Sequence, residues 1–166
     1  MDKRDFSISN ILAYGLVLIL LVNIFWLFNK NPLSENTEIR NATTPIHASC
    51  SETKKSGPDG MGIDLYYTYS FKGDITDDSV QALIKTMDEI SSRKRKLDSV
   101  GGVTIYGGAV NSDISISYMI DDRYIDLVMT NEKDVMFDMG TEGAAYTLNK
   151  GDFEKLVEII KQYNEN

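Results

Sequence analysis

One apolar stretch of the chain raises the question of an anion-binding loop. It reads LDSVGGVTIYGGAV over residues 97–110. Its four glycines are Gly101, Gly102, Gly107 and Gly108. Gly102 and Gly107 have the spacing of a phosphate-binding loop, but Gly108 and Ala109 stand where that loop needs lysine and serine or threonine. The stretch therefore predicts a strand over 103–106 with glycine at both ends, where a bend or the close approach of another backbone is allowed.

The same glycines could belong to an oxyanion hole. A helical pattern over 73–90 followed by LDSVGGV resembles the Clp-protease and crotonase pattern, in which Gly-Gly amides help to hold an oxyanion. That resemblance implies a serine on a helix and a later histidine. The serines at 112, 115 and 117 lie in an alternating strand pattern instead, and no histidine follows His47. The base of a catalytic triad is missing.

Other catalytic and metal motifs are incomplete. Ser51 to Lys54 and Ser91 to Lys94 match S-x-x-K, but neither is followed by Lys-Thr-Gly. The aspartates at 121, 122, 126, 134 and 138 lack the spacing of a calcium loop. One cysteine and one histidine exclude a multi-Cys or multi-His metal site. From the sequence we expect a protein that is not an enzyme and that binds neither a cofactor nor a metal ion. A tethered hydrolase would need a pair of carboxylates, for which Asp64 and Asp126 are the candidates.

Three side chains are candidates for sensing or for an interface. His47 is a candidate pH sensor because histidine side chains change charge near physiological pH, and Cys50 could form an intermolecular disulfide in an oxidising compartment. The alternation over 63–71 places Leu65 and Tyr67 on the buried face of their strand. Tyr66 points away from that face and suits a protein interface or an apolar ligand pocket. Together with the four glycines they form the candidate set.

The N-terminus predicts a membrane anchor. Residues 11–28 carry no charge and would span roughly 27 Å as a helix, close to a hydrocarbon core. No small-x-small cleavage site follows, and Lys3 and Arg4 precede the run, so the positive-inside bias places residues 1–10 in the cytoplasm. Residues 29–60 contain all three prolines and few apolar side chains, which predicts a flexible tether.

Residues 61–166 predict an extracytoplasmic α+β domain. Alternating apolar residues predict strands over 63–71, 114–120, 125–129, 135–139 and 144–148, besides 103–106. Helical spacing predicts one helix from Thr76 that ends at 93–96 and a second that Asn149 caps, with Asp152 three residues later as an imperfect capping box. We expect a mainly antiparallel sheet of about five strands with two helices, preceded by one transmembrane helix. The sequence does not decide whether this sheet closes into a barrel.

The net charge of the chain limits the classes of partner that it can bind. Residues 1–60 carry six acids and six bases, so the net charge of −8 comes from residues 61–166. An acidic domain is repelled by the phosphate backbone of nucleic acids, so we expect that it does not bind DNA or RNA. It suits a protein partner, with a small apolar ligand as a further candidate.

The whole layout resembles small accessory partners of membrane-bound transcription activators, the ToxS, TcpH and PsaF/MyfF kind, although no diagnostic motif carries the likeness. The resemblance implies a single-pass protein of the bacterial inner membrane whose periplasmic domain binds and stabilises a membrane-anchored regulator, or senses the exterior with it. Two alternatives stay open: an envelope inhibitor or immunity protein, whose acidic domain would meet a basic enzyme, and a tethered envelope hydrolase.

Overall fold

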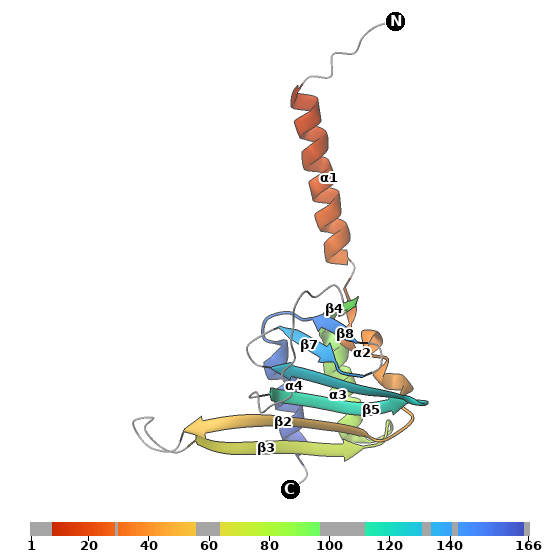
Figure 1. Cartoon of the computed structure of the whole chain (residues 1–166), viewed down its shortest axis with the longest axis vertical. Coiled ribbons are helices and arrows are strands. Elements are labelled where there is room, and N and C mark those ends of the chain that lie inside the picture. Colours follow the sequence, from red (N-terminus) through yellow and green to blue (C-terminus); the bar gives the residue numbers. More distant parts are fainter. Residues whose placement is uncertain are drawn as a thin grey trace, which may run out of the picture. The chain divides into compact units, whose positions relative to one another are not determined.

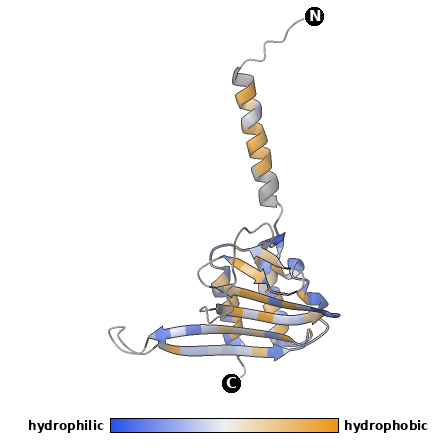
Figure 2. Cartoon of the chain, viewed as in Figure 1, coloured by the Kyte–Doolittle hydropathy of each residue, from blue (hydrophilic) through white to orange (hydrophobic). Residues whose placement is uncertain are grey.

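A computed structural model of the chain describes residues 8–28, 30–55, 64–96, 112–130, 134–140 and 143–164. The chain divides into two compact units, residues 1–30 and 31–166. The first contains the helix α1 (Ile8–Phe28). Figure 2 shows α1 mostly apolar over its coloured residues. We expected residues 11–28 to cross a membrane. This expectation is corrected: among the described residues, no helix has both the length and the hydropathy that a membrane span requires.

The second unit is an α+β fold built on one antiparallel sheet (Figure 1). Its described strands are β1 (Asn31–Pro32), β2 (Ile46–Lys55), β3 (Asp64–Gly73), β4 (Ser91–Lys96), β5 (Ser112–Ile120), β6 (Arg123–Thr130), β7 (Val135–Asp138) and β8 (Ala144–Thr147). Its helices are α2 (Leu33–Asn36), the 3-10 turn η1 (Ile39–Asn41), α3 (Asp78–Glu89) and α4 (Asp152–Gln162). The strand order is β1-β4-β8-β7-β6-β5-β2-β3.

The expected sheet of about five strands is therefore too small, because eight strands form over the described residues. The sheet is open, with β1 at one edge and β3 at the other, so the barrel that the sequence left open does not form there. Residues 93–96 do not end a helix. Helix α3 ends at Glu89 because Ile90 turns to an extended backbone, and the basic residues then pair with β8 as strand β4.

The segment that was expected to be a tether is largely folded. Residues 31–55 form β1, α2, η1 and β2 within the second unit. Leu33, Ile39, Ile46 and Ala48 are fully buried there. These few apolar side chains pack into the core, and hydrogen bonds to the sheet and to α3 fix the polar remainder.

The core lies between one face of the sheet and the helices α3 and α4, which cover the same side of it (Figure 1). The alternation expected in β5 and β6 is present, since Ile114, Ile116 and Tyr118 are buried, as are Ile125 and Leu127. Each helix buries one apolar stripe. The buried helix residues are Val80, Leu83, Ile84 and Met87 in α3, and Leu156, Val157 and Ile160 in α4. The expected N-cap at Asn149 is wrong, because α4 begins at Asp152 with Gly151 as its N-cap and without a side-chain cap hydrogen bond. The backbone N–H of Asn149 donates to Asp152 Oδ2 at 2.6 Å in the turn before the helix.

Candidate functional site

The two edges of the sheet differ in how well they are protected against pairing with an additional strand. At one edge, β1 has only two residues, including Pro32, and α2 follows directly. The backbone N–H of Leu33 donates to the Ile90 carbonyl at 2.8 Å, and the Asn36 amide donates to the Ser92 carbonyl at 3.1 Å. Short strands, proline and covering helices are the usual means of preventing strand addition at an edge. The edge at β1 is therefore closed.

The opposite edge is β3, a strand of ten residues without proline, which pairs with β2 in unbroken register from Asp64 to Gly73. We define its capped half as residues 69–73 and its open half as residues 64–68. Phe71 in the capped half is buried and meets the Tyr163 ring edge-on at 6.3 Å between centroids. The ammonium group of Lys161 lies 5.1 Å from the Tyr69 ring centroid. The C-terminal end of α4 thus covers the capped half.

One hydrogen bond fixes the boundary between the two halves. The backbone N–H of Ser70 donates to the side-chain oxygen of Asn164 at 2.8 Å, so it points away from β2. In a regular antiparallel ladder, alternate residues turn their N–H and C=O groups to the same edge. Because the register is unbroken, Thr68 and Tyr66 present these groups to the outer edge as Ser70 does. For these two residues, the described chain provides pairing only with β2.

Side chains in the open half are exposed although two of them belong to the helix side of the sheet. Leu65, Tyr66 and Tyr67 are 41%, 71% and 40% exposed. The sequence pattern placed Leu65 and Tyr67 on a buried face, and this expectation is wrong for these two residues. Figure 1 gives the reason: this end of the β2–β3 ribbon extends past α3 and α4, so neither helix covers it. The expected outward orientation of Tyr66 is confirmed.

Charged groups of β2 lie beside the open half. The ammonium group of Lys54 is 5.3 Å from the Tyr67 ring centroid and 3.5 Å from Glu52 Oε2, and the Lys54 side chain is 61% exposed. Glu52 also accepts a hydrogen bond from Lys161. The hydrogen bond from Lys161, assisted by the charges of both lysines, lowers the pKa of Glu52 despite its partial burial. The carboxylate is thus committed to two lysines at neutral pH.

The other candidate residues do not join this site. His47 is exposed on β2 and shares the outer face with Tyr66, but six ladder positions separate them, roughly 20 Å. Cys50 is buried on the helix side, opposite Tyr69, so its thiol is not presented for an intermolecular disulfide. Gly101, Gly102, Gly107 and Gly108 lie outside the described residues.

The carboxylate pair of the hydrolase alternative is not assembled. Asp64 begins β3 and Asp126 lies on β6, with β2 and β5 between these strands. Asp126 instead accepts a hydrogen bond from the Ser115 hydroxyl at 3.1 Å. No group of three or more His, Cys, Asp or Glu residues that could hold a metal ion occurs within the described parts of the chain.

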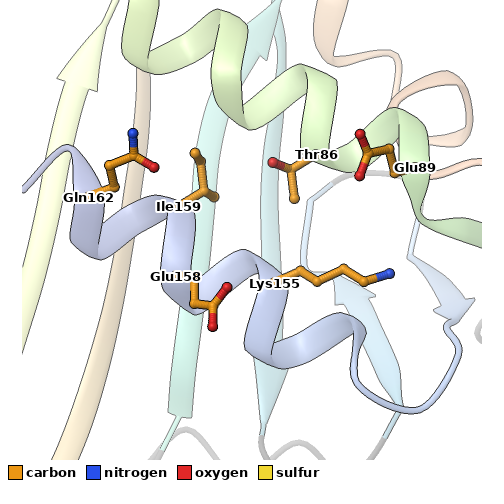
Figure 3. Close-up of a pocket in the computed structure, with 6 residues that line it drawn as sticks. All are labelled: Thr86, Glu89, Lys155, Glu158, Ile159 and Gln162. Atoms are coloured by element: carbon orange, nitrogen blue, oxygen red, sulfur yellow. The ribbon is translucent and has the colours of Figure 1, made fainter.

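A hollow of about 220 Å³ lies between α3 and α4 (Figure 3). It is lined by Thr86, Glu89, Lys155, Glu158, Ile159 and Gln162. Lys155 is paired with Asp152 at 3.1 Å, and Ile159 is the one large apolar side chain of the lining. This lining does not suit the small apolar ligand that the sequence suggested, and it contains no nucleophile with a base.

A polar cluster that no sequence motif indicates holds the segment 33–41 in place. The Tyr118 hydroxyl donates to the Thr37 carbonyl at 2.7 Å, and burial raises the pKa of this phenol. Arg123 pairs with Glu38 at 2.9 Å. Arg40 pairs with Asp88 at 2.6 Å, and its hydrogen bond is the main cause that lowers the pKa of Asp88. These contacts hold the segment against the sheet and α3, so their role is structural.

Comparison with known protein families, curated proteins and solved structures gives no match. The open half of β3, with Lys54 beside it, is therefore selected as the candidate site by its own geometry.

Proposed function

We propose that this protein is a binding partner, and not an enzyme, of a membrane-anchored transcription regulator, which it stabilises or with which it senses the exterior. The observation that carries the proposal is the open half of β3, where an edge strand exposes one aliphatic and two aromatic side chains side by side. Tyrosine is enriched at protein interfaces because it combines a large apolar ring with a hydroxyl group.

The distribution of reactive groups supports a binding role. His47 is remote from the exposed tyrosines, Cys50 is buried, and Asp64 and Asp126 lie on strands that do not touch. A catalytic centre needs such groups within hydrogen-bond reach of one another.

We place the folded unit on the periplasmic side of the bacterial inner membrane as part of the same proposal. Support comes from α1, in which ten large apolar or aromatic side chains between Ile11 and Val22 are more than half exposed. Exposed apolar surface of this kind favours an apolar environment, either a lipid surface or a partner's helix. Fractionation of cells and protease accessibility of an epitope after Asn164 test the location.

The function is tested by deleting the gene and by co-purification from membranes. We expect the level or the target transcription of a membrane-anchored regulator to fall on deletion, and the regulator to co-purify with the tagged full chain. An unchanged regulator level together with unchanged transcription would overturn the proposal. Co-purification of a basic lytic enzyme or toxin would favour the inhibitor alternative, which the net charge of −8 makes the second candidate.

A further inference from the structure

We infer that the open half of β3 accepts an extended, acidic segment of a partner protein as an added strand. This inference rests on the proposed binding function and specifies its mode. Addition of a strand to an exposed sheet edge is a common way of recognising an extended peptide: main-chain hydrogen bonds supply affinity, and alternate side chains supply specificity.

The backbone sets the length of the added segment. Tyr66 and Thr68 turn their N–H and C=O groups to the outer edge, as the hydrogen bond of Ser70 to Asn164 shows by alternation. The backbone N–H of Ser70 already donates a hydrogen bond to the side chain of Asn164. The partner therefore pairs with residues 64–68 and stops before Ser70.

The side chains set an alternating pattern in the partner. Leu65 and Tyr67 stand on the helix side of the sheet, and Tyr66 and Thr68 stand on the outer side, where Tyr66 is opposite Thr53. Neighbours on one face of a sheet contact each other across strands. A segment with an apolar residue beside Leu65 and hydroxyl-bearing residues beside Tyr66 and Thr68 fits both faces.

Charge selects an acidic segment. Although the chain has a net charge of −8, the ammonium groups of Lys54 and Lys161 lie beside two aromatic rings of β3, those of Tyr67 and Tyr69. Lys54 is largely exposed and lies over the Tyr67 ring, one strand from the partner, while Glu52 is held by Lys54 and Lys161. A partner carboxylate beside Tyr67 would be within reach of Lys54. A second copy of this chain fits less well, because pairing the same edge with itself would bring the lysines of both copies together.

The test is a titration of the isotope-labelled full chain in detergent with two blocked peptides, Thr-Glu-Thr-Val-Thr and Thr-Lys-Thr-Val-Thr, followed by the backbone amide resonances. We expect the glutamate peptide to shift the amides of Tyr66 and Thr68 saturably, with little change at Ser70. The lysine peptide should bind about threefold or more weakly, as expected for one cross-strand charge pair. The absence of a saturable shift at Tyr66 and Thr68 would overturn the inference.

Two variants at position 68 test whether its outward-facing backbone N–H is needed for peptide binding. Thr68→Pro removes an N–H that faces outward while keeping the ladder to β2, so the fold should persist and peptide binding should be lost. Thr68→Ala is the matched control, because it keeps the N–H and should retain binding. Equal binding by both variants would overturn strand addition.

Two further variants keep the inference testable if proline at position 68 unfolds the ribbon. Asn164→Ala frees the Ser70 donor, so the shifted amides should extend to Ser70 and the glutamate peptide should bind more tightly. Lys54→Glu should reverse the preference between the two peptides. Unchanged affinity and unchanged preference in these variants would contradict the inference.

Three outcomes separate this inference from the proposed function. Shifts of the same amides with protein concentration alone would identify a second copy as the occupant and overturn the acidic segment. A regulator that co-purifies equally with wild type and Thr68→Pro would leave the function standing and overturn the edge. Peptide binding at the edge without any co-purified regulator would support the edge and count against the regulator.

Discussion

The closed edge at β1 and the open half of β3 bound the same sheet, and they show what each edge is built to do. At β1 a two-residue strand with Pro32 leads into a segment whose Leu33 is fully buried. At the open half of β3, two potential ladder residues face outward beside exposed tyrosines. An edge that is closed by buried contacts contributes to folding. An edge that no other described strand pairs with contributes little to stability and can accept an added strand.

The largest expected difference between the edges is in side-chain truncation. Leu33→Ala removes a fully buried side chain, and we expect a loss of about 2–5 kcal/mol in the free energy of unfolding. Leu65→Ala at the open half should change it by less than about 0.5 kcal/mol, because 41% of that residue is already exposed. Urea denaturation of the two variants measures both values. Comparable losses would contradict the division between a structural edge and an unpaired one.

A smaller effect is expected at the buried hydroxyl that fastens segment 33–41. Tyr118→Phe leaves the Thr37 carbonyl without its donor, which should cost about 1–2 kcal/mol. Tyr124→Phe, on the same sheet but half exposed, is the matched control and should be neutral.

The pH dependence of the same variant provides a separate check. The folded pKa of Tyr118 is raised by burial above its ordinary value of 10.0. Its contribution is therefore complete below pH 10 and is lost as the pH rises through the folded value. Denaturation above pH 10 should weaken wild type more than Tyr118→Phe. An identical alkaline loss in both proteins would contradict the buried position.

The Arg40–Asp88 pair at the closed edge should matter less, because its side chains are 50% and 38% exposed. Asp88→Asn should cost no more than about 1 kcal/mol at neutral pH. The pKa of Asp88 is lowered from 3.8, so its contribution is present above pH 3.8 and is lost as the pH falls through the lower folded value. Wild type should therefore lose its advantage over Asp88→Asn in acid, as thermal unfolding at pH 7 and pH 2.5 would show. An advantage that persists at pH 2.5 would contradict this assignment.

How far the sequence predicted these regions depends on where the apolar side chains are. The strands β5 and β6 were predictable because isoleucine and leucine alternate there with serine and aspartate and are buried in the core. Strand β2 was missed although Ile46, Ala48 and Cys50 also alternate, because polar residues and nearby prolines indicated a tether.

The candidate site was predictable only in part. Tyr66 was recognised as outward-facing, but the exposure of Leu65 and Tyr67 depends on where α3 and α4 end relative to the ribbon. That boundary is a property of tertiary packing, as is the contact of Asn164 with Ser70, ninety-four residues away along the chain. Local alternation carries no signal for either feature.

The smallest expected effect tests the boundary within β3 itself. In hydrogen exchange corrected for intrinsic rates, the Ser70 amide should exchange about 2–10-fold more slowly than the Thr68 amide, since one hydrogen bond contributes about 0.5–1.5 kcal/mol. Asn164→Ala should bring the two rates together, whereas Gln162→Ala, an exposed position at the same helix end, should leave them apart. The amides of Tyr67 and Tyr69 face β2 and should stay protected in all three proteins. Equal rates for Ser70 and Thr68 in wild type would mean that Asn164 does not cap the edge, and an added strand could then extend into the capped half.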